Sequence, residues 1–442
     1  MQKQKKSKFQ RDIDERELSS QIKLHIDQES RNLFQSDVRR RKAMTRGGRR
    51  VAILAVILVA LFFWTLIFGN VCSFSGYNVI GNRLVIRWDT IGMLDLWKNS
   101  IGEILSMSFH ARWNLMGYTC IFLVGMAMSC SGAVYQGVFQ NPMASPTTLG
   151  VTAGGILGGI VYILFFWDSS FMNALVSEYG TETTGGGLVW AATADELMEI
   201  YSEMSVFDLY GMTICTVLGC FAGVMLIVGI SMISGKGKIN TLSLMLSGSI
   251  FATVVDTVTQ TVQYAILYNV GVDSTDVRLS AIASLQGSSS SIGNSMQLAP
   301  FLFVAIPVGL CLVICFSMTG KLNILVFGED EARAMGVPVQ RFRVILIICC
   351  TVMTATVMAF CGQISMLGFL MPHLARFLVG PDFKHLVPAS ALLGGIGCLI
   401  VANVCSATMS YGNFNTYIGV FCTVASILFI LLYRRNRHAD WS

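Results

Sequence analysis

The chain has 442 residues, of which 53% are hydrophobic and only 13% are charged. Soluble domains carry roughly 25% charged residues, so this composition excludes an ordinary soluble enzyme and indicates an integral membrane protein. The formal net charge is +5, but basic residues are mixed with acidic ones and lack interleaved aromatic residues, which argues against nucleic-acid binding.

Residues 1–50 form a basic arm before the first apolar run, with 15 Lys and Arg against 7 Asp and Glu. Because basic residues that flank a membrane helix stay in the cytoplasm, the arm is expected to be cytoplasmic. About fifty polar residues precede the first apolar run, so this run is expected to be a retained helix rather than a signal peptide. The arm either fixes the topology or binds anionic membrane lipid.

Apolar runs of about 20 residues, the length that spans a bilayer core, recur along the chain. They predict about ten transmembrane helices, at 51–69, 114–138, 148–167, 207–233, 240–268, 298–318, 344–362, 364–380, 386–409 and 413–433. The expected fold is an all-α polytopic membrane protein with a transmembrane domain over 51–433. A basic tail at 434–442 predicts that the C-terminus, like the N-terminus, is cytoplasmic.

Two loops between these segments differ in charge. Loop 168–206 has seven acidic residues and no Lys or Arg, which predicts an extracytoplasmic position, whereas loop 319–343 is basic and is expected in the cytoplasm. Twelve of the 13 cysteines lie within or at the edge of apolar segments, and none forms a Cys-x-x-Cys pair. The cysteines are interpreted as small apolar residues, so no metal site is predicted.

The first stretch that suggests a function, SGAVYQGVFQNPMASPTTLG, covers 131–150. One apolar segment ends at Asn141 and Pro142, and the next begins after Pro146. A backbone break at a membrane face needs protein or water to satisfy its polar groups, and such breaks mark binding sites and gates in transporters. An ordinary interhelical turn explains the break equally well.

The second stretch, FGEDEARAMGVPV, covers 327–339. Glu329, Asp330 and Glu331 favour the start of a helix, because acidic side chains stabilise its positive end. Gly336 and Pro338 indicate its end. A helix this short is marginal in isolation, so we expect it to dock into a partner, with a self-packed interfacial loop as the alternative.

The third stretch, GQISMLGFLMPHLARFLVG, covers 362–380. Small residues such as Gly368 permit close contact between helices. Pro372 interrupts the run, and the ionisable His373 and Arg376 are expected to face the bundle interior or water. His373 has no second ligand at metal-binding spacing, so it does not predict a zinc site. Arg376 could equally extend to the cytoplasm.

The segment 240–268 carries a polar face. Thr253, Asp256, Thr257 and Gln260 are three or four positions apart and therefore share one side of a helix. A polar face in lipid should turn inward, which predicts that this helix lines a transport path, with polar contacts between helices as the alternative. If Asp256 meets the substrate, a ferric or cationic complex is favoured.

In this order, the three stretches resemble the FecCD or vitamin B12-type permease subunits of ABC importers for iron-siderophores, haem and cobalamin. The family pattern is roughly SGxxxQxxxxNPLAxPxxLG, then LGExxARxLGV, then GxIxFxGLxxPHxxRxLxG, and the likeness covers about 110–400. The resemblance implies ten helices per subunit and import of a metal chelate across the plasma membrane by alternating access. It also implies a homodimer or a heterodimer with a related permease, two ATPase subunits and an extracytoplasmic binding protein.

The chain has no GxxxxGK[ST] stretch and so no nucleotide-hydrolysing site of the P-loop type. It is therefore expected to be a permease and not an enzyme, and to bind no cofactor itself. The resemblance implies that a separate ATPase subunit uses ATP.

The resemblance also assigns residues. The loop at Asn141–Met143 and the turn near Asn240–Thr241 would narrow the cytoplasmic end of the path, and 327–337 would contain the helix that the ATPase receives. The expected path and gate residues are Gln136, Asn141, Pro142, Met143, Asn240, Thr241, Asp256 and Gln260. The expected coupling residues are Gly328, Glu329, Glu331, Ala332, Ala334 and Gly336, and the motif near the eighth helix contributes Gly368, Pro372, His373 and Arg376.

The half of the chain that is expected to face the binding protein departs from the family pattern. Asn114–Gly117 stand where an Arg-Leu-Pro-Arg-like stretch is usual, and a family Asp and Arg near the end of the ninth helix are replaced by Asn403 and Ala407. The chain therefore lacks the arginines that usually form salt bridges to the binding protein. This leaves a divergent regulatory or scaffold subunit as one alternative, and an ion-gradient-driven secondary transporter that uses Asp256 as another.

Overall fold

The computed structural model describes most of the chain from the first helix to the last. The described residues are 47–65, 79–80, 83–84, 109–166, 180–182, 188–190, 206–235, 241–270, 277–286, 298–364, 366–408 and 414–435. Residues 1–46 of the basic arm predicted at 1–50, Asn240 and most of the acidic loop lie outside them. The chain divides into two units, Met1–Ile53 and Leu54–Ser442, and every contact discussed below lies in the second.

Each of the ten predicted apolar segments contains a helix within the described residues, because a helix satisfies its own backbone groups where no water is available. They are the helix Gly47–Thr65, α3 (Phe109–Val138), α4 (Val151–Phe165), α7 (Val206–Ser234), α8 (Thr241–Val270), α10 (Leu298–Leu325), α12 (Val339–Cys361), α13 (Leu367–Val379), α14 (Phe383–Thr408) and α15 (Phe414–Arg435). The expected all-α polytopic fold is thus confirmed, while the side of the membrane on which the termini lie stays a prediction.

Within the described ranges, six helices are long and apolar enough to cross a membrane. They are Gly47–Thr65 and the apolar parts of α3, α7, α10, α12 and α14. Three shorter apolar helices correspond to α4, α13 and part of α15. The remaining predicted segment, α8, belongs to neither group and is the helix on which the sequence places a polar face.

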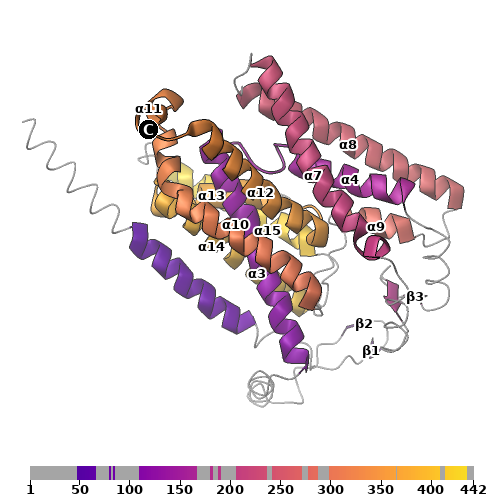
Figure 1. Cartoon of the computed structure of the whole chain (residues 1–442). Helices are drawn as coiled ribbons and strands as arrows, with labels where there is room; N and C mark the ends of the chain where they lie inside the picture. The colour runs from indigo at the N-terminus through magenta and orange to yellow at the C-terminus, as the bar shows by residue number, and fades with distance from the viewer. Residues whose placement is uncertain are drawn as a thin grey trace, which may run out of the picture. The chain divides into compact units, whose positions relative to one another are not determined.

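Helix α3 is the centre of the larger helix group. It packs against α10, α12, α13 and α14, which lie around it in Figure 1. Most residues of α3 from Tyr118 to Val138 are buried, among them the large side chains Tyr135 and Met128. Tyr135 also shares a hydrogen bond with Thr351 of α12, 3.2 Å between the hydroxyl oxygens. The end of α3 is therefore held in place from several sides.

Helices α4, α7 and α8 form a second group, which α12 joins to the first through its contacts with α4 and α7. The backbones of α4 and α7 are in contact. A Cβ atom added to Gly154 would lie 2.3 Å from the carbonyl oxygen of Gly219. Such close approach through small residues is typical of helix pairs in membranes.

The remaining described elements are short. Helix α9 (Val277–Leu285) has no counterpart in the sequence prediction, and α11 (Glu329–Ala334) corresponds to the short helix expected at 327–337. Two antiparallel hairpins complete the set, β1 (Val79–Ile80) with β2 (Arg83–Leu84) and β3 (Gly180–Glu182) with β4 (Leu188–Trp190). The β3–β4 hairpin falls within the predicted acidic loop.

Candidate functional site

The helix break predicted at Asn141 is present, and α3 ends at Val138. Gln140 adopts a left-handed backbone conformation with φ of 49°, which is uncommon for a residue other than glycine. The Asn141 side chain then closes the turn, because its Oδ1 accepts a hydrogen bond from the Met143 N–H at 2.9 Å. Its Nδ2 lies 2.8 Å from the Met245 sulfur. The break therefore contacts α8 at Met245, which lies four residues after Thr241.

Pro142 and Met143 form the tip of the loop between α3 and α4. This tip is exposed, whereas the part of the loop that leads into α4 is packed against the protein. Pro142 is exposed and Met143 has 51% of its surface accessible. The Ser145 N–H donates to Thr148 Oγ1 at 2.8 Å, and the Thr148 N–H donates to Ser145 Oγ at 3.2 Å. This reciprocal pair fixes the backbone that leads into α4, so the loop presents two exposed residues on a rigid base.

The short helix α11 has the limits that its sequence predicts. It begins after Gly328, which has φ of 125°, and its three acidic residues occupy the first turn. Gly336 follows the helix with φ of 80°, a conformation that favours glycine. Ala332 is fully buried and anchors the helix, while Ala334 on the same short helix is exposed.

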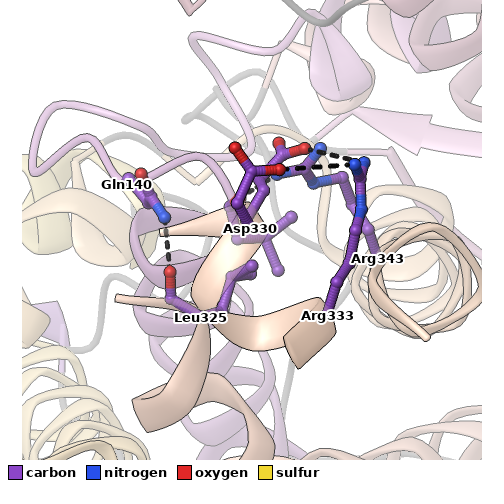
Figure 2. Close-up of polar contacts among 7 residues, drawn as sticks. Gln140, Leu325, Asp330, Arg333 and Arg343 are labelled. Atoms are coloured by element: carbon purple, nitrogen blue, oxygen red, sulfur yellow. Dashed lines mark hydrogen bonds and ion pairs between the residues drawn. The ribbon is translucent and has the colours of Figure 1, made fainter. Parts of the chain in front are cut away.

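Ion pairs connect α11 to α12. Glu329 Oε1 lies 2.8 Å from Nη2 of Arg343, whose side chain is only 14% exposed. Arg333 lies 3.4 Å from Glu329 and 3.5 Å from Asp330, but it is exposed, and such surface pairs contribute little stability. Figure 2 shows both arginines beside the acidic residues. Sequence reasoning found the acidic residues and missed Arg343, because nothing in the local pattern relates 329 to 343.

The third stretch meets the first directly. Gly368, in the first turn of α13, lies against the backbone of Gly132 in α3. A Cβ atom added to Gly368 would also be 3.1 Å from Pro146 Cδ. Pro372 is buried within α13. The helix that carries Pro372, His373 and Arg376 is therefore held against the break at 139–150.

The polar residues of α13 have mainly local contacts. His373 Nδ1 donates to the carbonyl oxygen of Phe369 at 2.8 Å, and the rings of the two residues are 4.6 Å apart between centroids. Arg376 is half-buried one turn after Pro372. Within the described residues, no group of His, Cys, Asp and Glu side chains could hold a metal ion.

The polar face of α8 is uncovered in the single chain. Thr253, Asp256, Thr257 and Gln260 are all exposed, as their spacing predicts for one side of a helix. Thr257 donates its hydroxyl to the Thr253 carbonyl at 2.8 Å, so its hydrogen-bonding capacity is largely used within α8. Asp256 and Gln260 remain as the polar groups that this face offers to another molecule. The side chain of Thr241 and all of Asn240 lie outside the described side chains.

Gln136 lies on the buried side of α3. It is 2% exposed, and neither its Oε1 nor its Nε2 has a hydrogen-bond partner within the described part of the chain. The structure therefore does not place it on an open path, and its expected path role stays a prediction. Burying an amide without hydrogen-bond partners costs free energy. An apolar side chain of similar size would avoid this cost, so packing alone does not explain why a glutamine occupies position 136.

Comparison with known proteins gives a consistent set of matches. The model of the FecCD transport family matches residues 57–435. The chain is 28% identical over 318 residues to "Uncharacterized ABC transporter permease protein YvrB" of Bacillus subtilis, which covers 71% of this chain and 76% of that protein. It is 26% identical over 361 residues to "Probable siderophore transport system permease protein YfhA" of the same organism, which covers 81% and 90%.

A solved ABC transporter of proposed metal-chelate type, in an inward-facing conformation, has a similar fold. It matches with a TM-score of 0.59 and 22% identity, over 87% of this chain and 99% of that chain. At this level of identity the match supports the fold.

Proposed function

The chain belongs to the FecCD transport family, and on this premise we propose that it is the permease subunit of an ATP-driven importer for an iron chelate or a related metal complex. The substrate would be a ferric siderophore, haem or a cobalamin-like complex. The observation that carries the proposal is the family match over 57–435, supported by α11 at the place where a coupling helix is expected. As a member of a transport family with several membrane-spanning helices, the chain is a multi-pass protein of the plasma membrane.

The choice of an iron chelate rests on relatives and on charge. YfhA is named as part of a siderophore transport system. Asp256 is exposed on α8 and would place a carboxylate where a cationic or ferric complex could pass. We therefore propose a metal chelate as the substrate class, with Asp256 and Gln260 lining the path.

The proposed partners follow from the surfaces that the single chain leaves uncovered. A second permease protomer, identical or related, would cover the polar face of α8 and enclose the path. An ATPase subunit would receive α11, whose Asp330 is 93% exposed and whose neighbouring Phe327 and Met335 are also exposed. An extracytoplasmic binding protein would deliver the chelate. ATP would bind to the ATPase, and this chain would need no cofactor of its own.

In this proposal the chain works by alternating access. ATP binding would move α11 and thereby open or close the exposed tip at Pro142 and Met143, which narrows one end of the path. The polar face of α8 would provide weak contacts along the way, because a substrate that must leave again requires no deep binding well. Residues on α13 would support the tip through the contact between Gly368 and Pro146.

The experiment that tests this function is reconstitution. The chain, its ATPase and a binding protein would be placed in proteoliposomes and offered ferric siderophores, haem and cobalamin one at a time. We expect uptake of one class that requires ATP and disappears with an ATPase variant unable to hydrolyse it. Uptake driven by an imposed ion gradient without ATP would instead identify a secondary transporter, and ATPase binding without any uptake would favour a regulatory subunit.

Coupling through α11 has a separate test. Gly336→Trp places a bulky residue at a backbone conformation that favours glycine, two positions after the last residue of α11, and should abolish co-purification of the ATPase. Gly380→Trp is the matched control, because Gly380 also has a positive φ and open space around it but follows α13 instead of α11. Retention of the ATPase by the Gly336→Trp variant would refute the assignment of α11 as the coupling helix.

A further inference from the structure

Hydrogen bonds on both sides of α11 connect the segment that carries this helix to the C-terminal end of α3. Before α11, the Gln140 side chain donates from Nε2 to the carbonyl oxygen of Leu325, the last residue of α10. After α11, Arg343 Nη2 donates to the carbonyl oxygen of Val138 at 3.5 Å. Figure 2 shows the bond between Gln140 and Leu325 beside α11. Residues 138 and 140 therefore hold both flanks of one short helix.

Arg343 makes the charged one of these connections. The same Nη2 atom that faces Val138 lies 2.8 Å from Glu329 Oε1 in the first turn of α11. Carbonyl groups in the last turn of a helix have no intrahelical partner and form its negative end. A guanidinium group between that end of α3 and the Glu329 carboxylate attracts both, so one side chain links α11 to α3.

The surroundings of Arg343 distinguish this link from an ordinary surface pair. Its side chain is 14% exposed, against 53% for Arg333, so water and salt screen its charge less. Its Nε atom is buried and has no partner within the described residues. Buried unpaired donors are rare and call for an explanation. A second arrangement of α11 against α3, in which Nε binds another acceptor, would supply one.

We propose that Arg343 is a positioning residue of the transport cycle, which passes a displacement of α11 to the end of α3. The break at Asn141–Met143 follows Val138 directly, so a shift of the Val138 carbonyl moves the tip that Pro142 and Met143 form. Gln140 serves as the second attachment on the other flank of α11. This inference rests on the proposed function, because it assumes that an ATPase moves α11.

The test uses the assembled complex with its ATPase in lipid nanodiscs and needs no transported substrate. Met143→Cys places a thiol at the exposed tip, and its rate of reaction with a charged maleimide is measured with and without Mg-ATP and vanadate. The same rate is measured on the chain that retains Met143, and this background from the native cysteines is subtracted. In the otherwise unchanged chain, nucleotide should alter the rate by roughly fivefold or more, within the usual range of allosteric coupling.

Arg343→Gln should retain the ATPase and its hydrolysis of ATP but lose this response to nucleotide. Arg341→Gln is the matched control, since Arg341 is exposed two positions earlier on the same helix, and it should keep the full response. Arg343→Lys should give an intermediate response, because an ammonium group lacks the planar fork of a guanidinium. Gln140→Asn, which tolerates the left-handed backbone but is too short to reach Leu325, should weaken the response.

Two results would overturn the inference. If Arg343→Gln keeps the full response to nucleotide, Arg343 transmits nothing to the tip. If the variant loses the ATPase altogether, Arg343 shapes the docking surface instead of transmitting its movement. Failure of the proposed function would look different, because then the chain without any Arg343 substitution would neither retain an ATPase nor respond to nucleotide.

Discussion

Gly132 of α3 and Gly368 of α13 are in backbone contact: a Cβ atom added to Gly132 would lie 1.7 Å from the carbonyl oxygen of Gly368. No side-chain rearrangement can relieve this overlap, because the opposing atom belongs to a backbone. The contact joins the first and third family stretches, which are more than 200 positions apart in the sequence. Through Pro146, it also supports the loop after α3.

Gly132→Ala should therefore force α3 and α13 apart and destabilise the protein by about 1–3 kcal/mol, as overpacking of a tight core does. Thermal unfolding of the purified chain in detergent measures the effect. Gly309→Ala on α10 is the matched control, since a Cβ atom there meets nothing within 4 Å. It should leave stability unchanged or raise it slightly, because alanine favours helix more than glycine does. Equal melting temperatures for the two variants would contradict the contact.

Asn403 should resist replacement by the acid that the family pattern carries at this place. Its Nδ2 donates to Thr65 Oγ1 and to the Leu399 carbonyl oxygen, both at 2.7 Å, and a carboxylate cannot donate either bond. Asn403→Asp should therefore cost about 1–3 kcal/mol through unmet hydrogen bonds, seen as a lower melting temperature. Adding Ala407→Arg, one turn later on α14, restores an i,i+4 ion pair and should recover part of the loss. A neutral effect of Asn403→Asp alone would show that these bonds contribute little.

Asp256→Asn should leave stability unchanged, because Asp256 is exposed on α8. If Asp256 lines the path as proposed, the variant should lower ATP-dependent uptake of a ferric or cationic chelate in proteoliposomes, because the path loses a carboxylate charge. Thr253→Val, on the same exposed face, is the control for a change in polarity without a change in charge. Unchanged uptake and substrate preference in Asp256→Asn would remove Asp256 from the path.

Gln136→Met should be neutral or stabilising. Met fills a similar volume in the buried position, and the change removes two polar atoms that have no partner among the described residues. An unsatisfied buried group costs about 1–3 kcal/mol, so the melting temperature in detergent should stay the same or rise. A clear decrease would mean that a bound water molecule or another partner satisfies the amide in solution. Uptake measured on the same variant tests the expected path role of Gln136.

The helices could be predicted from the sequence because the length of each apolar run can be compared with the length of a membrane-spanning helix. The limits of α11 were equally accessible, since three acidic residues and Gly336 mark its two ends. Helix α9 was missed because its nine residues are too few for a membrane span and lie between longer apolar runs. Helix α12 begins at Val339, five positions before the predicted start, because polar residues such as Arg341 and Arg343 hide its first turn from an apolar count.

The connections between elements could not be predicted in the same way. The spacing of Thr253, Asp256 and Gln260 defines a shared helix face, and this face is exposed in the single chain. The expectation that it lines a transport path stays a prediction. By contrast, the bonds from Gln140 to Leu325 and from Arg343 to Val138 join residues that are 185 and 205 positions apart. Periodicity carries no information on such pairs, because they depend on how whole helices pack.

The uncovered polar side of α8 has a consequence for biosynthesis. If a second protomer covers α8, as proposed above, a newly inserted protomer alone would expose Asp256 and Gln260 to hydrocarbon, where ionisable and polar groups are costly. Such an orphan subunit would be a preferred substrate for the proteases that clear misassembled membrane proteins. The amount of this chain in a cell should therefore follow the supply of the protomer that covers α8, even when translation of the chain itself is raised.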